Sequence, residues 1–274
     1  MGMQRVAVDG GVLEVEVRGS GEPVLLVQTA LSTDELRPLA EHELLRERYR
    51  TILYHRRGYG GSSPISGPGS VARDADDCRA LLAALGVEPA HVVGVSYSAA
   101  VALQLASSAP SSVRTVTAME PPPVHVPSAD EFRATNAELL ATFHADGAAA
   151  ALDRIMTMLA GPEWRRESER QSAGSVASME RDATTFFATD IPALLSWEFD
   201  AAAAARIRCP VLYVGGTESG PWFAQVRELV HTWLPHAEDV VIPGAGHLLA
   251  LTHPAEVATA VVDFLRRNPM DARL

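Results

Sequence analysis

The chain has 274 residues, of which 47% are hydrophobic, and its formal net charge is −11. The apolar fraction is enough for a sizeable core and excludes a disordered chain. The acidic balance argues against nucleic acid and anionic membranes as partners, because both select for surfaces rich in Lys and Arg. No stretch approaches the roughly 18 uninterrupted apolar residues of a membrane span, and the first residues lack a signal-peptide run. We therefore expect a soluble, cytoplasmic protein that acts on a small molecule.

Two cysteines, Cys78 and Cys209, lie far apart in the sequence and lack the spacing of a metal site. They are expected to be buried free thiols in a reducing compartment. No metal and no other cofactor is predicted. A homodimer is left open as the assembly state.

Eight stretches have the composition of β-strands: 6–8, 12–17, 23–27, 49–54, 90–95, 113–118, 209–214 and 239–242. The first two are typical of a hairpin, because 12–17 alternates apolar and charged residues. The continuous apolar run 23–27 instead favours a strand that is buried on both faces. Helical spacing is found in 34–46, 70–85, 101–106, 221–234 and 254–267, and Gly86 is predicted to end the second of these helices.

This alternation of strands and helices predicts an α/β fold with a mostly parallel sheet that is covered on both faces. Residues 123–205 interrupt the alternation, since they are rich in Ala, helical in character and without strand-like runs. We therefore expect a core formed by 1–122 and 206–274 and an inserted helical cap formed by 123–205. Ligands of parallel sheets bind beyond the carboxyl ends of the strands, and the insertion begins and ends at that edge.

The most informative stretch is Gly94-Val95-Ser96-Tyr97-Ser98, where a strand is predicted to turn sharply into a helix. Such a turn strains the backbone of the central serine and leaves no room for bulky neighbours two positions away. The stretch matches the nucleophile-elbow pattern G-x-S-x-G except that a serine replaces the last glycine. By itself, this pattern is equally compatible with a strand-to-helix turn that has no chemistry.

Two further motifs follow the same order as in a known family. The segment 57–62 is similar to an R-G-x-G-x-S loop, and 244–247 is similar to the loop that carries a catalytic histidine. With these motifs and the elbow, residues 5–268 resemble an α/β-hydrolase with a helical cap. The resemblance implies an eight-stranded, mostly parallel sheet flanked by helices.

The resemblance also implies a catalytic triad. Ser96 would be the nucleophile, and His247 would be the base that a weakly acidic hydroxyl needs. In most relatives the acid is an aspartate at the position that aligns with Ser219 here, so its neighbour Glu218 is one candidate. A minority of proteins with this fold carry the catalytic acid one strand earlier, where this chain has Glu120. We favour Glu120 and keep Glu218 as the alternative.

An oxyanion hole requires two backbone N–H groups that point at the developing negative charge. The resemblance assigns these to Tyr97, which follows the nucleophile, and to Ala30. Relatives usually have His-Gly-x in the loop that contains the second donor, whereas this chain has Gln28-Thr29-Ala30. Backbone donation does not depend on the side chain, but the loss of glycine changes which backbone conformations are allowed.

The predicted function is a serine hydrolase that cleaves a small-to-medium apolar ester, thioester or lactone through an acyl-enzyme. The same scaffold also supports other chemistry. The alternatives are a carbon–carbon bond hydrolase, a cofactor-free haloperoxidase, a lyase or a cyclase. A further alternative is a binding protein that has kept the pocket without catalysis.

Overall fold

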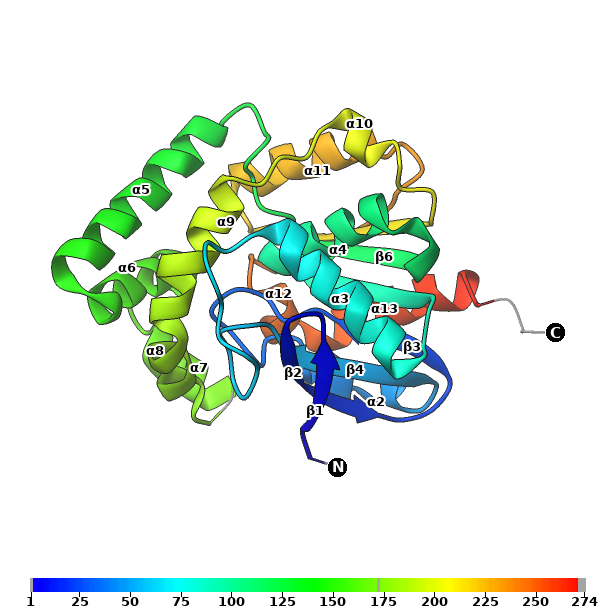
Figure 1. The fold of residues 1–274 in the computed structure, drawn as a ribbon. Helices are drawn as coiled ribbons and strands as arrows, with labels where there is room; N and C mark the ends of the chain where they lie inside the picture. The colour runs from blue at the N-terminus through cyan, green and yellow to red at the C-terminus, as the bar shows by residue number, and fades with distance from the viewer. Residues whose placement is uncertain (1, 172, 271–274) are drawn as a thin grey trace.

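The computed structural model describes residues 2–171 and 173–270, and its centre is an eight-stranded sheet with the order β1-β2-β4-β3-β5-β6-β7-β8 (Figure 1). The strands are β1 (Gln4–Val8), β2 (Gly11–Arg18), β3 (Glu22–Leu26), β4 (Tyr49–His55), β5 (Ala90–Val95), β6 (Val113–Met119), β7 (Val211–Gly216) and β8 (Glu238–Ile242). Strand β2 pairs antiparallel with β1 and β4, and the remaining pairs are parallel. The prediction of an eight-stranded, mostly parallel sheet is confirmed.

The helical segments connect and cover these strands. They are α1 (Arg37–Glu41), α2 (Glu43–Arg46), α3 (Val71–Leu85), α4 (Tyr97–Ser108), η1 (Pro110–Ser112), α5 (Ala129–Asp146), α6 (Ala148–Ala160), α7 (Trp164–Gln171), α8 (Ser175–Thr185), η2 (Phe186–Asp190), α9 (Ile191–Leu195), α10 (Ala201–Ala204), α11 (Pro221–Trp233), α12 (Leu249–Thr252) and α13 (Pro254–Arg267). The segment η1 is a 3-10 turn and η2 is a single π-helical turn. Gly86 ends α3 in the left-handed conformation, as the sequence predicts.

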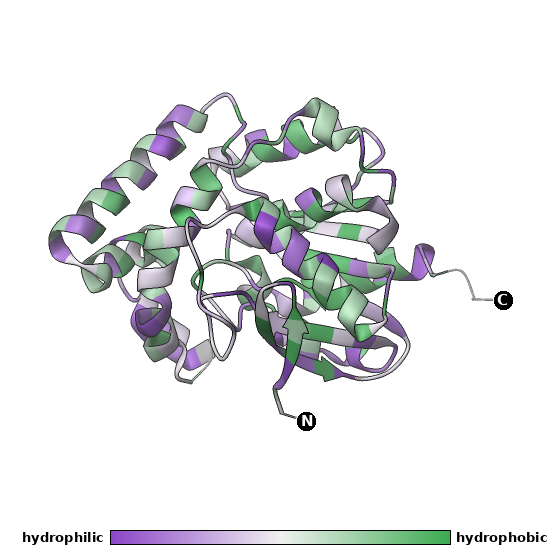
Figure 2. Cartoon of the chain, viewed as in Figure 1, coloured by the Kyte–Doolittle hydropathy of each residue, from purple (hydrophilic) through white to green (hydrophobic). Residues whose placement is uncertain are grey.

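Alternate side chains of the central strands pack into two cores on opposite faces of the sheet. Leu25 faces the core formed with α3, α4 and α11, whereas its neighbours Val24 and Leu26 face the core formed with α1, α2, α12 and α13. This follows from the two-residue period of a strand. Figure 2 shows hydrophobic residues concentrated along the strands, and polar residues on the outer faces of helices such as α5. Burial on both faces explains why these strands are continuous apolar runs.

The helices between β6 and β7 form a third cluster of buried residues to one side of the sheet (Figure 1). Side chains of α5, α6, α8, η2 and α9 pack together there, and Leu31 from the loop after β3 joins them. The chain returns to the main core before β7 begins, because Trp197, Phe199 and Ala203 pack with α4 and the sheet. The third cluster is therefore built mainly by α5 to α9.

One predicted helix is wrong in its extent. The helical spacing of 34–46 corresponds to two short helices, because His42 has the extended backbone angles φ −62° and ψ 135°. This residue ends α1 and caps α2, and its ring accepts a hydrogen bond from the backbone N–H of Leu44. Residues 34–36 precede α1, so they belong to the loop at the edge of the sheet.

Within the described residues, no helix combines the length and the apolar character that a membrane crossing requires.

Candidate active site

Ser96 lies at the sharp turn from β5 to α4, with the backbone angles φ 51° and ψ −120°. A positive φ is uncommon and costly for a residue with a side chain. The turn is so tight that a Cβ atom on Gly94 would lie 2.2 Å from the backbone oxygen of Ser98, so only glycine fits at that position. The N–H of Ser96 donates to the carbonyl of Met119 at 2.9 Å, which fastens the turn to β6.

Ser98 occupies the place where the elbow pattern has its last glycine. Its buried hydroxyl accepts a hydrogen bond from the N–H of Val95 at 2.8 Å and donates to the carbonyl of Val95 at 2.9 Å. The Ser98 hydroxyl thus gives the N–H of Val95 a side-chain partner and shares the carbonyl of Val95 with the hydroxyl of Thr29. The serine thus fits the elbow, and it adds hydrogen bonds that glycine could not make.

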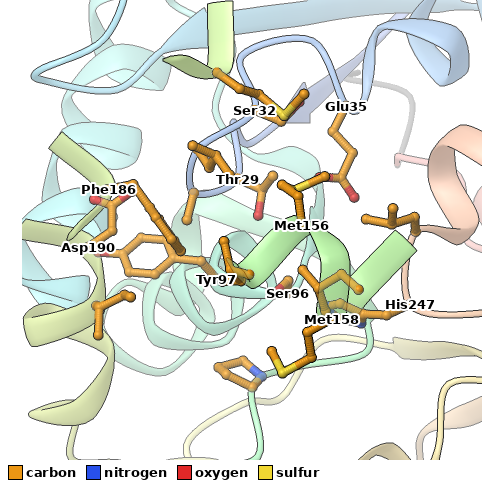
Figure 3. A pocket seen from close by; sticks show the side chains of 18 of the residues that line it. Thr29, Ser32, Glu35, Ser96, Tyr97, Met156, Met158, Phe186, Asp190 and His247 are labelled. Atoms are coloured by element: carbon orange, nitrogen blue, oxygen red, sulfur yellow. The ribbon is translucent and has the colours of Figure 1, made fainter. Parts of the chain in front are cut away.

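His247 lies in the loop between β8 and α12, with its Nδ1 atom 2.7 Å from Oε2 of Glu120. The imidazole ring stacks on Phe223, with the ring centres 4.1 Å apart and the planes inclined by 18°. The carboxylate and the aromatic ring together fix the orientation of the imidazole. Its side chain remains partly exposed, and both His247 and Ser96 line one cavity (Figure 3).

Glu120 follows β6 directly and is fully buried, with the uncommon backbone angle φ 44°. Its Oε1 atom accepts a hydrogen bond from the N–H of Gly216 at 2.8 Å, which leaves Oε2 for His247. Glu218, the alternative acid, is exposed, and its backbone N–H donates to the carbonyl of Ala245. The carboxyl group that contacts His247 is therefore that of Glu120.

The two expected oxyanion donors border the same cavity, since Ala30 and Tyr97 both line it. Tyr97 is the first residue of α4, so its N–H has no partner within the helix. The loop of Ala30 is shaped without glycine. Leu31 adopts the positive φ of 65°, and its N–H donates to the hydroxyl of Tyr59 at 3.1 Å. The hydroxyl of Thr29 donates to the carbonyl of Val95 at 2.8 Å, which joins this loop to the elbow strand.

A buried network of charged side chains around Arg56 holds the loop of Ala30 in place. The guanidinium of Arg56 forms ion pairs of 2.7 Å with Asp74 and 2.6 Å with Asp190, and it donates to the carbonyl of Gln28 at 3.0 Å. The hydroxyl of Tyr97 donates to Asp74 at 2.9 Å. Burial raises the pKa of Asp74, and the charge of Arg56 opposes that rise.

Sequence reasoning missed this network. Asp190 belongs to η2, between β6 and β7 and 134 residues from Arg56, and nothing local indicates that the two meet. Arg56 directly precedes the R-G loop motif, so its place in the sequence was the one available signal.

The cavity has a volume of about 200 Å³ and lies between the carboxyl edge of the sheet and helices α5 to α9. Most of its lining side chains are apolar, including Leu139, Met156, Phe186 and Ile191. Met158 of α6 lines the cavity and is half exposed, which places it at the mouth. Figure 3 shows side chains of the helices between β6 and β7 and of the loops at the sheet edge around Ser96.

Glu35 is a second residue that sequence reasoning missed. It lines the cavity and is only 7% exposed. Burial raises the pKa of its carboxyl group to about 7, and the nearby charge of His247 acts in the opposite direction. Its position in a polar run directly after the loop of Ala30 could have drawn attention to it. No cluster of His, Cys, Asp or Glu side chains suited to a metal ion is found within residues 2–171 and 173–270.

Comparisons with known proteins agree with this geometry. A family model described as alpha/beta hydrolase fold matches residues 27–254. The chain is 28% identical over 272 residues to a putative carbamate hydrolase RutD of Caulobacter sp. (strain K31), a match that covers 96% of this chain and 98% of that protein. It is 24% identical over 242 residues to a protein of the same name from Escherichia coli, with 85% and 84% of the two chains covered.

Solved structures show the same fold. A thermophilic esterase from Thermogutta terrifontis superposes with a TM-score of 0.82 at 21% identity, covering 98% of this chain and all of that one. The enol-lactonase from Burkholderia xenovorans LB400 superposes with a TM-score of 0.79 at 20% identity, with 96% of this chain and 100% of that chain covered. The family match spans most of the chain, and the sheet order and the elbow agree with it. The chain therefore belongs to the alpha/beta hydrolase fold family and is a hydrolase of that fold.

Proposed function

We propose that the chain is a serine hydrolase in which Ser96 attacks a carboxylic ester, thioester or lactone and forms an acyl-enzyme. The observation that carries the proposal is the 2.7 Å contact between Glu120 and Nδ1 of His247, in a cavity that Ser96 also lines. A carboxylate at Nδ1 keeps the proton there, so that Nε2 is free to act as a base.

In the first half of the reaction, the hydroxyl proton of Ser96 passes to Nε2 of His247 as Oγ bonds to the substrate carbonyl carbon. The carbonyl oxygen becomes an oxyanion, which accepts hydrogen bonds from the N–H groups of Ala30 and Tyr97. The tetrahedral intermediate then collapses, the bond to the leaving group breaks, and His247 gives its proton to the leaving oxygen or sulfur.

The second half repeats these steps with water. His247 takes a proton from the water molecule as its oxygen adds to the acyl carbon. The second tetrahedral intermediate then collapses, the bond to Oγ of Ser96 breaks as His247 returns the proton to Oγ, and the carboxylic acid is released. Glu120 stabilises the imidazolium in both halves.

The substrate proposed is small to medium in size and largely apolar. The cavity of about 200 Å³ and its apolar lining support this. We place the cap in residues 123–205, because α5 to α9 supply much of the lining and would shield the reacting carbonyl from bulk water. The relatives named for carbamate hydrolysis add carbamates to the carbonyl compounds worth testing, since the same attack applies to them.

A panel of p-nitrophenyl esters with acyl chains of increasing length tests the proposal, with Ser96→Ala as the inactive variant. We expect turnover that depends on Ser96 and a fluorophosphonate label on Ser96 in the wild type. Glu218→Gln, which changes an exposed carboxyl group, serves as a matched control. Folded protein that takes no label and hydrolyses no ester would overturn the proposal. Labelling without ester turnover would point to different chemistry at the same serine.

A further inference from the structure

The cavity contains one carboxyl group that the proposed reaction does not use. Glu35 reaches from the loop before α1 into the cavity that Ser96 and His247 also line (Figure 3). Its side chain is almost wholly removed from solvent. Among the described residues, no hydrogen-bonding partner is found for its carboxyl group. A buried polar group without a partner is costly, so it is uncommon unless a ligand or solvent completes it.

The other acidic residues that line the cavity are already paired. Asp34 forms an ion pair of 2.7 Å with Arg37, and Asp190 is held by Arg56. No lining residue within the described chain is Lys or Arg. His247 interacts electrostatically with Glu35, and the two other acidic residues of the lining are compensated by arginines. Among the described acidic residues of this lining, Glu35 is thus the one without an ion pair, in a wall that is mostly apolar and that also contains hydroxyl groups, including the buried and unpartnered hydroxyl of Ser175.

We propose that Glu35 forms a subsite for a hydrogen-bond donor of the substrate, a hydroxyl, N–H or ammonium group a few atoms from the reacting carbonyl. This inference rests on the proposed hydrolysis at Ser96. Above pH 7, where the carboxyl group of Glu35 is ionised, it binds such a donor strongly, because the hydrogen bond is charge-assisted and water is excluded. The same carboxylate repels substrates that carry a carboxylate of their own. The proposed substrates are therefore neutral or cationic carbonyl compounds that carry a hydrogen-bond donor.

Matched ethyl esters test this subsite. Ethyl butyrate has no donor, ethyl 3-hydroxybutyrate has a neutral one, ethyl 3-aminobutyrate has a cationic one, and monoethyl succinate is anionic. In the wild type at pH 8, where Glu35 is mostly ionised, we expect a higher kcat/KM for the two esters with donors than for ethyl butyrate, and the lowest value for monoethyl succinate. Glu35→Leu should lower kcat/KM for the donor esters roughly ten- to a hundredfold, the range for a hydrogen bond to a charged group.

Ethyl butyrate is the internal control. Its kcat/KM should change little in Glu35→Leu, whereas an equal loss for all four esters would mean that Glu35 acts through His247 or through folding. Glu35→Gln keeps a neutral acceptor of the same shape, so it should retain the hydroxyl ester, lose the ammonium ester and improve monoethyl succinate. Glu47→Gln, an exposed carboxyl group outside the cavity, should leave all four unchanged.

A binding experiment separates this inference from the proposed function. The dissociation constants of 3-aminobutyramide and butyramide can be measured by calorimetry with Ser96→Ala, with and without Glu35→Leu. Tighter binding of the amine that disappears in the double variant supports the subsite even if no ester is hydrolysed. If ester hydrolysis depends on Ser96 but neither kinetics nor binding distinguishes the donor compounds, the subsite is wrong and the proposed function stands.

Discussion

Oε2 of Glu120 lies 2.7 Å from Nδ1 of His247, although 127 residues separate the two in the sequence. The carboxylate comes from the end of β6, and the histidine comes from the loop after β8. The second oxygen of Glu120 is held by the N–H of Gly216 at the end of β7, the strand that lies between them. The backbone of one strand thus orients the carboxylate that a neighbouring strand supplies.

This relationship predicts different effects for two glutamates. Glu120→Gln should lower kcat roughly a thousandfold or more, because an amide neither fixes the proton on Nδ1 nor stabilises the imidazolium. Glu218→Gln should leave kcat close to that of the wild type, since Glu218 is exposed and its carboxyl group is not the one on His247. Steady-state kinetics on one p-nitrophenyl ester compares them. A larger loss in Glu218→Gln would reverse the assignment of the acid.

Ser98, which stands at the last glycine of the elbow pattern, predicts a stability effect that is separate from catalysis. Ser98→Ala removes both hydrogen bonds to Val95 in a fully buried turn, so the free energy of unfolding should fall by about 1–3 kcal/mol. Ser108→Ala removes an exposed hydroxyl bond in the same helix and should change stability little. Urea denaturation followed by circular dichroism measures both. Equal stability of the two variants would contradict a structural role for the Ser98 hydroxyl.

The buried carboxyl group of Glu35 predicts a pH-dependent stability difference. Its pKa of about 7 in the folded protein lies above the ordinary value of 4.5, so the folded state holds a proton that the unfolded chain releases between these values. The contribution of Glu35 to the free energy of unfolding therefore falls as the pH rises from 4.5 to 7, and the loss persists above 7. Relative to wild type, Glu35→Gln should gain up to about 3 kcal/mol at pH 8 and nothing at pH 4.5.

Denaturation curves of both proteins across this pH range give the difference directly, and Glu47→Gln controls for the loss of an exposed carboxyl group. His247 faces Glu35, and the nearby acids Asp34 and Asp190 are paired with Arg37 and Arg56. A constant difference between wild type and Glu35→Gln at every pH would show that Glu35 does not titrate in this range.

The network around Arg56 predicts a large cost when one partner is removed. Asp190→Ala leaves the buried guanidinium with a single carboxylate, and the free energy of unfolding should fall by about 3–5 kcal/mol. Glu180→Ala, which breaks the exposed pair with Arg165, should cost less than about 1 kcal/mol. The same denaturation assay compares them. A small effect of Asp190→Ala would mean that the network does not link the insertion to the sheet.

Much of the fold could be predicted because its signals are local. Continuous apolar runs marked the strands, and the closing helix was predicted with the limits that the structure has, Pro254–Arg267. The split at His42 was missed, because its cause is a single extended residue inside a run with helical spacing. The helical character of 123–205 was predicted, but the division of its side chains between two clusters depends on packing that no local pattern encodes.

The sequence by itself determined the α/β sheet, the strand-to-helix turn at Ser96 and the order of the motifs. These features depend on the periodicity of apolar residues and on small residues at tight turns, which act over a few neighbouring positions. It left the acid open between Glu120 and Glu218, and their catalytic roles, like that of Ser96, stay predictions. Only the tertiary structure decided which carboxyl group contacts His247, since that depends on the strand order at the carboxyl edge. It also decided that Glu35 is buried, in a cavity whose lining includes residues of helices from far along the chain.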